Sequence, residues 1–131
     1  MDDGMLAARQ RLEQLRQEAH RAAQESQAFA QNLEAREHVG WSSRREVRVR
    51  VGSDGLIRDV EFTPSAPSLS PATLSRLTME AHDRALLALR DAVDELAAHA
   101  LPSSPELSTL MSASYHQSIP SRVEVLRDDL R

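Results

Sequence analysis

The chain has no cysteine and no lysine, and aromatic side chains make up only 3% of its 131 residues. The lack of cysteine excludes disulfides and thiolate chemistry. The scarcity of aromatic rings argues against a surface that stacks the bases of single-stranded nucleic acid, because such surfaces use several exposed rings. All 16 basic residues are arginine, whose planar guanidinium suits contacts with phosphate and carboxylate groups.

Positive charge is also scarce, and it is unevenly distributed. The 20 acidic and 16 basic residues give a net charge of −4, which argues against a general binder of polyanions. Residues 1–40 have five arginines and seven acids, residues 65–101 have three and five, and residues 102–131 have three and four. Residues 41–64, with five arginines and four acids, are the one segment with a positive balance.

Long apolar runs are missing too. No run is long enough to span a membrane, and the N-terminus lacks the pattern of a secretory signal, so the simplest expectation is a cytoplasmic protein. A chain of this length suits one domain with an appended segment. We expect the domain over residues 1–101 and a C-terminal tail over residues 102–131.

Two segments have the apolar spacing of helices, and the first is residues 5–37. This segment contains neither glycine nor proline, and its apolar side chains recur at the two seam positions of a seven-residue repeat. The seam residues are Met5, Ala8, Leu12, Leu15, Ala19, Ala22, Ser26, Phe29 and Leu33. Many of them are small, which favours close contact with another helix. Gly40 is expected near the C-cap.

The second helix is expected from Pro71 to about Ala100. Ser70 supplies a capping side chain, and proline suits the first helical position. The apolar stripe of this helix comprises Leu74, Leu77, Ala81, Ala85, Ala88, Leu89, Ala92 and Leu96. After Pro102 we expect one short helix around Glu106–Ala113 and a mobile tail. This segment lacks a sustained apolar period, so we expect it to be dispensable for folding of the rest.

Residues 46–64 have the alternation of a β-hairpin. Valine occupies every second position from Val47 to Val51, as in a strand with one buried face. Asp54-Gly55 is a strong signal for a two-residue type I′ turn. A turn there predicts a register that matches apolar with apolar residues and cations with anions. The predicted pairs are Val47 with Phe62, Arg48 with Glu61, Val49 with Val60, and Arg50 with Asp59.

Together these elements predict an α+β fold with a long N-terminal helix, a small antiparallel sheet of two to three strands, a second long helix and a flexible C-terminal tail. The segment His38–Ser43 is expected to be a short first strand or a loop that carries Trp41. One sheet face and two shallow seams are hard to bury in a monomer of this size, so a homodimer that shares them is the natural remedy. The expected interface residues are Val47, Val49, Val60 and Phe62.

The order of these patterns is itself distinctive. A long helix precedes a V-x-V-x-V strand, a turn region, a V-x-[IF]-x-P strand and an alanine-rich helix, over roughly residues 5–100. The residues that carry the pattern are Val47, Val49, Val51, Gly55, Val60, Glu61, Phe62, Pro64, Ala81 and Ala85. This arrangement resembles the YbaB/EbfC family of bacterial nucleoid-associated proteins.

The resemblance implies a protomer with the order helix, three strands, helix. It also implies a homodimer whose paired helices project like tweezers, and duplex DNA binding of low sequence specificity in the nucleoid. Some members of the family are linked to secretion systems as accessory proteins. A dimeric adaptor that binds a protein partner, with little or no DNA affinity, is therefore the alternative.

Arginine side chains are the candidates for DNA contacts, because they neutralise phosphates and release counterions without reading bases. The predicted DNA-binding residues are Arg44, Arg45, Arg48, Arg9 and Arg16. The competing hypothesis is a solvated surface of ion pairs, since Arg9–Glu13 and Arg21–Glu25 have the i,i+4 spacing of helical pairs. The sheet arginines likewise face acids across the predicted strands. Arg44, Arg45 and Arg16 have no obvious acidic neighbour.

No pattern predicts an enzyme, a metal site or a cofactor site. Glu34–His38 and Glu95–His99 have helical i,i+4 spacing, but each supplies two of the three or four ligands that a metal site needs. The segment Gly52–Gly55 joins two antiparallel strands and precedes no helix, so it does not predict a phosphate loop. Two hypotheses remain for Trp41, an interface anchor or a cap over the helix–sheet junction.

Overall fold

The computed structural model describes residues 2–100, 105–117, 119–120 and 123. Within these residues, three α-helices and a three-stranded antiparallel sheet in the order β1-β2-β3 confirm the α+β fold. In chain order the elements are α1 (Asp2–Ala35), β1 (His38–Trp41), β2 (Val47–Val51), β3 (Ile57–Phe62), a short 3₁₀ helix η1 (Ala66–Ser68), α2 (Pro71–Ala100) and α3 (Pro105–His116). Ser70 caps α2 as expected, because its Oγ accepts the backbone N–H of Thr73 at 3.2 Å.

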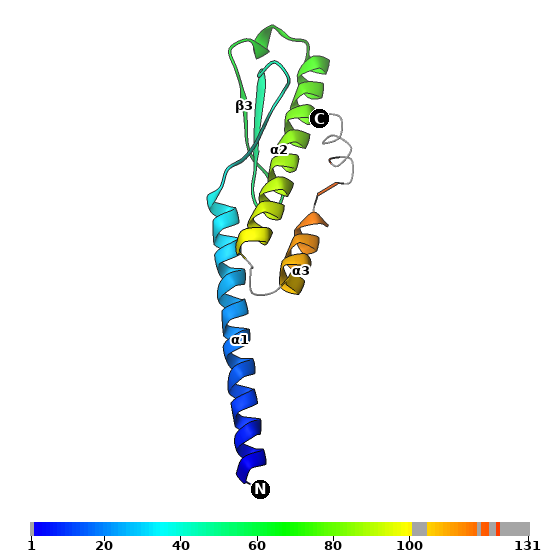
Figure 1. The fold of residues 1–131 in the computed structure, drawn as a ribbon. Helices are drawn as coiled ribbons and strands as arrows, with labels where there is room; N and C mark the ends of the chain where they lie inside the picture. Colours follow the sequence, from blue (N-terminus) through cyan, green and yellow to red (C-terminus); the bar gives the residue numbers. More distant parts are fainter. Residues whose placement is uncertain (1, 101–104, 118, 121–122, 124–131) are drawn as a thin grey trace.

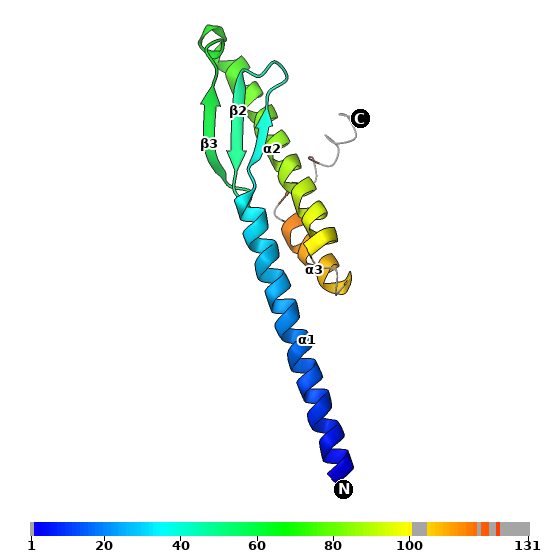
Figure 2. The same ribbon diagram turned by 60° about the vertical axis from the view of Figure 1, so that its left-hand side comes forward.

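Helix α2 lies across one face of the sheet, and α1 leaves the end of the sheet as a long arm (Figures 1 and 2). The C-terminal part of α1 packs beside the C-terminal half of α2, and α3 also lies along α2. Side chains from Asp2 to Arg21 are all exposed, and the first buried side chain of the helix is Phe29. The predicted seam therefore has a buried C-terminal end and a bare N-terminal end.

The core lies between α2 and the first two strands. Val47 and Val49 are fully buried there, together with Ala81 and Ala85 of α2. Burying apolar surface in this layer is the main source of stability. Because both valines are covered within one protomer, they have no surface to offer a second copy. These two members of the expected dimer interface lie in the protomer's own core.

Gly40 allows the close approach of β1 to α2. A side chain at this position would collide with backbone atoms of the helix, namely the carbonyl oxygen of Ala81 and the amide nitrogen of Ala85, and would lie 2.7 Å from the carbonyl carbon of Arg84. The expected role of Gly40 as a C-cap is therefore wrong. The helix α1 ends at Ala35, and Gly40 lies inside the strand.

The predicted register of the hairpin is confirmed in all four pairs, from Val47 opposite Phe62 to Arg50 opposite Asp59. The turn differs from the expected two-residue type I′ turn. The N–H of Gly55 donates to the carbonyl of Gly52, and the N–H of Gly52 donates to the carbonyl of Leu56, each at 2.9 Å. Three residues thus form the loop, and a bulge beside Arg50 restores the register.

Strand β3 is one of the two edge strands of the sheet, and its apolar face is largely uncovered. Helix α2 packs on β1 and β2, so the side chains that β3 adds to the same face lie beyond the helix. Ile57 is 49% exposed and Phe62 is 54% exposed, while Val60 is half-buried. Exposed apolar side chains on an unpaired edge strand are a frequent feature of surfaces that contact another chain.

Helix α3 docks on the core. The ring of Tyr115 packs against that of Phe29, with centroids 5.5 Å apart. Asp94 Oδ1 on α2 lies 3.0 Å from Ser112 Oγ and 2.7 Å from His116 Nε2. The short helix is confirmed, but the expectation that the segment after Pro102 is dispensable conflicts with this packing. The mobility expected of the tail falls mainly on residues 121–122 and 124–131, which lie outside the described residues.

Replacing Tyr115 with alanine is expected to lower the free energy of unfolding by about 2 kcal/mol, because the ring is half-buried against Phe29. Urea unfolding followed by circular dichroism measures this change. Leu110→Ala on the same helix is the control, because that side chain is 68% exposed and should change stability by less than about 0.5 kcal/mol. Equal stabilities for the two variants would show that α3 contributes nothing to the core.

Candidate nucleic-acid interface

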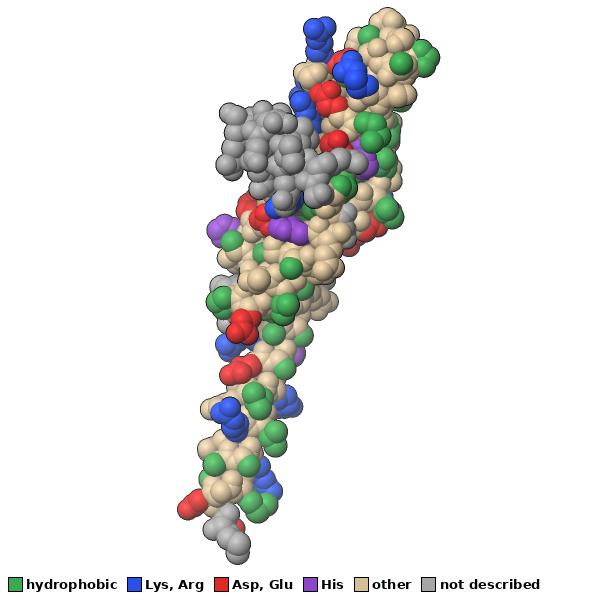
Figure 3. All heavy atoms as spheres, turned by 90° about the vertical axis from the view of Figure 1, so that its right-hand side faces the viewer, with side chains coloured by type: hydrophobic (Ala, Val, Ile, Leu, Met, Phe, Trp, Pro, Cys, Tyr) green, Lys and Arg blue, Asp and Glu red, His purple; other side chains and the backbone are tan. Residues whose placement is uncertain are grey.

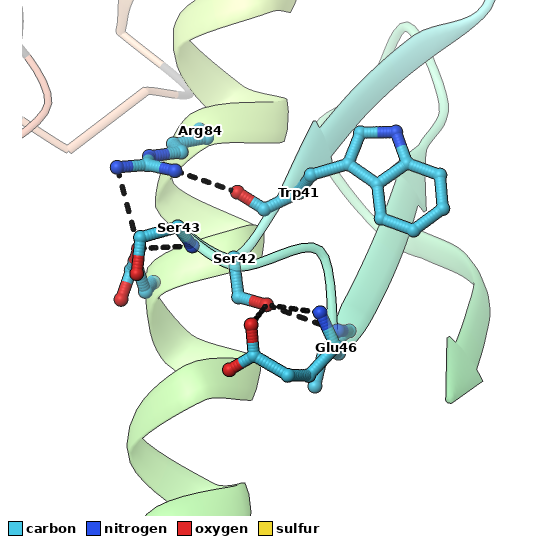
Figure 4. Close-up of polar contacts among 7 residues, drawn as sticks. Trp41, Ser42, Ser43, Glu46 and Arg84 are labelled. Atoms are coloured by element: carbon cyan, nitrogen blue, oxygen red, sulfur yellow. Dashed lines mark hydrogen bonds and ion pairs between the residues drawn. The ribbon is translucent and has the colours of Figure 1, made fainter. Parts of the chain in front are cut away.

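The candidate site is the connection between β1 and β2, residues 42–46, which we call the arginine loop because it contains Arg44 and Arg45. Its turn is closed by a hydrogen bond of 2.9 Å from the N–H of Arg45 to the carbonyl of Ser42. The Ser42 side chain, which is buried, accepts the backbone N–H groups of Glu46 and Val47 at 3.0 Å each (Figure 4). Hydrogen bonds within the loop and to Val47 therefore fix its backbone conformation.

Arg44 and Arg45 are both exposed. Among the described residues, neither guanidinium has a carboxylate partner, as the sequence predicted for this pair. The guanidinium of Arg45 stacks on the indole of Trp41, 4.2 Å from the ring centroid, a cation–π contact that leaves the positive charge unneutralised. Two cations at neighbouring positions thus project from the loop without counter-ions.

Arg45 has a backbone φ of 60°, in the left-handed region. A residue with a β-carbon pays a conformational cost of about 1 kcal/mol or more there. Such strain is concentrated at functional sites. The backbone of this loop therefore favours a functional role for Arg45.

Trp41 lies on the face of the sheet opposite α2, because side chains alternate along β1 and Gly40 faces the helix. Figure 4 shows the indole directed away from α2. The hypothesis that Trp41 caps the helix–sheet junction is therefore wrong. The ring supports Arg45 instead.

Arg48 lies in the middle of the same outer face, with its side chain 19% exposed. Its guanidinium nitrogens are 3.5 Å from Glu37, 3.7 Å from Glu61 and 4.0 Å from Asp59. Three carboxylates thus oppose one cation. Arg48 has less positive potential to offer a phosphate than the two arginines of the loop.

The arm carries the other predicted contacts. Arg9 is exposed, and Arg16 pairs with Glu13 at 2.8 Å, so the expectation that Arg16 lacks a local acid is wrong. This exposed pair is worth little energetically. Arg16 precedes the end of α1 by 19 residues, about 28 Å at 1.5 Å per residue. One protomer therefore does not bring the arm arginines together with the loop.

Figure 3 shows hydrophobic side chains along the projecting part of α1, interleaved with arginine and acidic side chains. The exposed apolar residues of this part include Met5, Leu6, Leu12 and Leu15, at 62%, 56%, 67% and 49%. Positive charge on the arm is therefore mixed with both apolar and acidic groups. The arginine loop is the more concentrated cationic feature.

One of the two candidate pairs of metal ligands is not a helical pair. His38 is in β1, beyond the end of α1, so Glu34 and His38 are not a helical pair. His38 is buried with Nε2 2.9 Å from the carbonyl of Leu33, and burial lowers its pKa. Among the described residues, no group of three or more acids or histidines could hold a metal ion. No helix within the described ranges is long and apolar enough to cross a bilayer.

Two residues of the site could not be predicted from the sequence. Glu80 on α2 contacts Ser43 of the arginine loop from 37 residues away in the sequence. Arg84 on α2 contacts Trp41, the strand residue just before the loop, from 43 residues away. Their i,i+4 spacing predicts that they pair with each other, and the pair is present at 3.3 Å. No local pattern indicates that the same side chains reach the loop.

Comparison with known proteins gives one assignment. The sequence model of the YbaB/EbfC DNA-binding family matches residues 9–103, which include most of α1, the whole sheet and α2. No curated protein matches the chain. The matched segment covers more than half of the chain and carries the hairpin and both long helices in the order that the resemblance implied. The chain belongs to the YbaB/EbfC family of DNA-binding, nucleoid-associated proteins.

Proposed function

We propose that the protein is a homodimer that binds duplex DNA through phosphate contacts, with low sequence specificity. The observation that carries this proposal is the pair of arginines on the arginine loop that have no carboxylate partner among the described residues, in a chain that belongs to a DNA-binding family. Guanidinium groups bind phosphate oxygens with two hydrogen bonds in a fixed geometry. The loop is therefore suited to the DNA backbone.

The overall charge sets the expected strength of binding. With a net charge of −4, the protein as a whole is repelled by DNA, so attraction must come from a local patch. Arg48 and Arg16 are opposed by carboxylates, and they contribute less than Arg44 and Arg45. We expect weak binding that falls steeply as salt is added, because phosphate contacts release counterions.

Two bare apolar surfaces support the homodimer. One is the N-terminal half of the α1 seam, where Leu12 is 67% exposed, and the other is the face of β3 with Val60 and Phe62. Surfaces of this kind are commonly buried between identical subunits. Val60 and Phe62 are the members of the predicted interface set that remain available for it. A dimer has two arginine loops, which doubles the cations available to a duplex.

Phe62→Glu is expected to weaken dimerisation at least about tenfold, because it places a charge on the proposed apolar interface. The side chain is 54% exposed in the protomer, so the fold should survive. Sedimentation equilibrium over a range of protein concentrations measures the change. Leu110→Glu is the control, since Leu110 is exposed on α3, outside the proposed interface. A dimer unaffected by Phe62→Glu would exclude this face.

Fluorescence anisotropy with labelled duplexes of equal length and unrelated sequence tests the function itself. We expect affinities within a few-fold of one another, because phosphate contacts do not distinguish bases. Affinity confined to one sequence would contradict the low specificity. Absence of binding to every duplex at low salt would contradict the DNA-binding proposal and favour the dimeric protein adaptor.

A further inference from the structure

We propose that Glu80 and Arg84 on α2 are positioning residues that hold the arginine loop in its DNA-binding conformation. This inference rests on the proposed function. Neither side chain needs to touch DNA in this role. Glu80 acts through the backbone of the loop at Ser43, and Arg84 acts through the backbone of Trp41 just before it. Together they determine where Arg44 and Arg45 project.

The two side chains project from one helical turn of α2 and bind the backbone where β1 ends and the loop begins. Glu80 Oε1 accepts the backbone N–H of Ser43 at 2.7 Å. Arg84 Nη1 donates to the carbonyl of Trp41 at 2.9 Å. A salt bridge of 3.3 Å between Arg84 Nη2 and Glu80 Oε1 joins the two contacts. We call this arrangement the clamp.

The clamp is partly shielded from water. The side chains of Glu80 and Arg84 are 23% and 28% exposed, so their contacts are weakened by solvent less than those of fully exposed pairs. The close packing of Gly40 on α2 brings β1 to the helix just before the loop. The clamp thus extends a rigid contact between strand and helix into the segment that carries the arginines.

A loop that is already fixed in the free protein favours binding, because ordering a flexible loop on contact with DNA costs free energy. A flexible loop would lose backbone and side-chain freedom on contact with DNA. Here the backbone is fixed beforehand, although Arg45 has a strained φ of 60°. Strained residues persist only where surrounding contacts determine their conformation. The clamp and the indole of Trp41 supply contacts on both sides of the loop.

Glu80 allows a sharp test, because its charge and its positioning role have opposite effects on DNA affinity. Its carboxylate lies beside a cationic loop, so removing the charge alone should strengthen attraction to phosphate. Removing the hydrogen-bond acceptor should release Ser43 and weaken binding. Glu80→Gln removes the charge but keeps an acceptor oxygen, whereas Glu80→Ala removes both.

Duplex affinity is therefore measured by fluorescence anisotropy for the full chain with Glu80→Ala, Glu80→Gln or Glu61→Ala. Glu61→Ala is the matched control, because it removes one carboxylate from the outer face of the sheet, where Glu61 contacts Arg48. We expect Glu80→Ala to bind about fivefold more weakly than the wild type. We expect Glu80→Gln and Glu61→Ala to bind as well as the wild type or more tightly. An affinity gain for Glu80→Ala, like that of the control, would overturn the proposal.

Trp41 gives a readout that does not depend on DNA, because it is the single tryptophan of the chain. The stacked guanidinium of Arg45 covers one face of its ring. If the clamp holds the loop, Glu80→Ala should increase quenching of tryptophan fluorescence by acrylamide, whereas Glu80→Gln should change it much less. Quenching identical to the wild type in Glu80→Ala would overturn the clamp, provided that circular dichroism shows a folded protein.

The two measurements separate the clamp from the function that it serves. If the wild type bound no duplex, the DNA-binding proposal would fail, and increased quenching in Glu80→Ala would still establish that α2 holds the loop. If the wild type bound DNA but Glu80→Ala lost no affinity, positioning by the clamp would be excluded while the function stood. Arg84→Gln should increase quenching as Glu80→Ala does, because it removes the guanidinium that donates to Trp41 and pairs with Glu80.

Discussion

Gly40→Val is expected to lower the free energy of unfolding by about 3 kcal/mol or more. A side chain at this position meets backbone atoms of α2, including the carbonyl oxygen of Ala81 and the amide nitrogen of Ala85. Backbone atoms cannot rotate away as a flexible side chain can, so the strand and the helix must separate. Separation opens the layer that contains Val47 and Val49, and overpacked cores lose stability in this way.

Gly4→Val is the matched control for this prediction. No atom lies within 4 Å of the position that a β-carbon would occupy at Gly4, so the change in stability should be below about 0.5 kcal/mol. Urea unfolding followed by circular dichroism compares the two variants. Equal stabilities for Gly40→Val and Gly4→Val would mean that β1 and α2 are not in backbone contact.

The double replacement Arg44→Ala with Arg45→Ala is expected to weaken binding to all duplexes alike, by about 1,000-fold at low salt. A dimer would lose four charge-assisted contacts, each of which contributes on the order of 1 kcal/mol or more. Both side chains are exposed, and neither has an acid partner among the described residues. The fold and the dimer should therefore remain intact.

A second double variant, Arg36→Ala with Arg58→Ala, controls for net charge. It removes two arginines as well, but Arg36 pairs with Glu95 at 3.1 Å and Arg58 pairs with Asp54 at 2.9 Å. Anisotropy titrations at one salt concentration compare the two. We expect the control to retain most of its affinity. Equal losses in both variants would show that total charge, rather than the arginine loop, determines binding.

The hairpin shows how much of the fold can be predicted from local sequence. The register was predictable because apolar matching and charge matching both selected Val49 opposite Val60 and Arg50 opposite Asp59. The turn geometry was not predictable from Asp54-Gly55, because the bulge next to Arg50 restores the same register after a longer loop. Two different turns are therefore compatible with one pattern of side chains.

Contacts between distant segments account for the other differences. Gly40 follows a helix in the sequence, which favours a C-cap, but the approach of α2 from more than 40 residues away determines its role. The docking of α3 depends on the packing of Tyr115 against Phe29 of α1. Neither the contact of Gly40 with α2 nor that of Tyr115 with Phe29 produces a periodic pattern in the sequence. Core positions such as Val47 and Val49 were predictable, but whether α2 or a second copy covers them was not.

The candidate site was predictable only in part, because some of its contacts join segments that are distant in the sequence. Arg44 and Arg45 lack acids at helical or cross-strand spacing, and the structure leaves them uncompensated. The expectation that Arg16 lacks a local acid was wrong, because Glu13 pairs with it. The residues that hold the loop, Glu80 and Arg84, belong to another element. Local sequence therefore indicates which arginines are free, while the tertiary fold determines how they are presented.

The salt dependence of duplex binding by the intact protein tests the central claim most directly. If the two arginine loops of a dimer neutralise four phosphates, the logarithm of the association constant should fall linearly with the logarithm of the salt concentration, with a slope of about −3.6. The Arg44→Ala, Arg45→Ala variant should have a much flatter slope, which reflects only the weaker contacts of the remaining arginines. A wild-type protein that fails to bind any duplex at low salt, or that binds with no dependence on salt, would contradict the account.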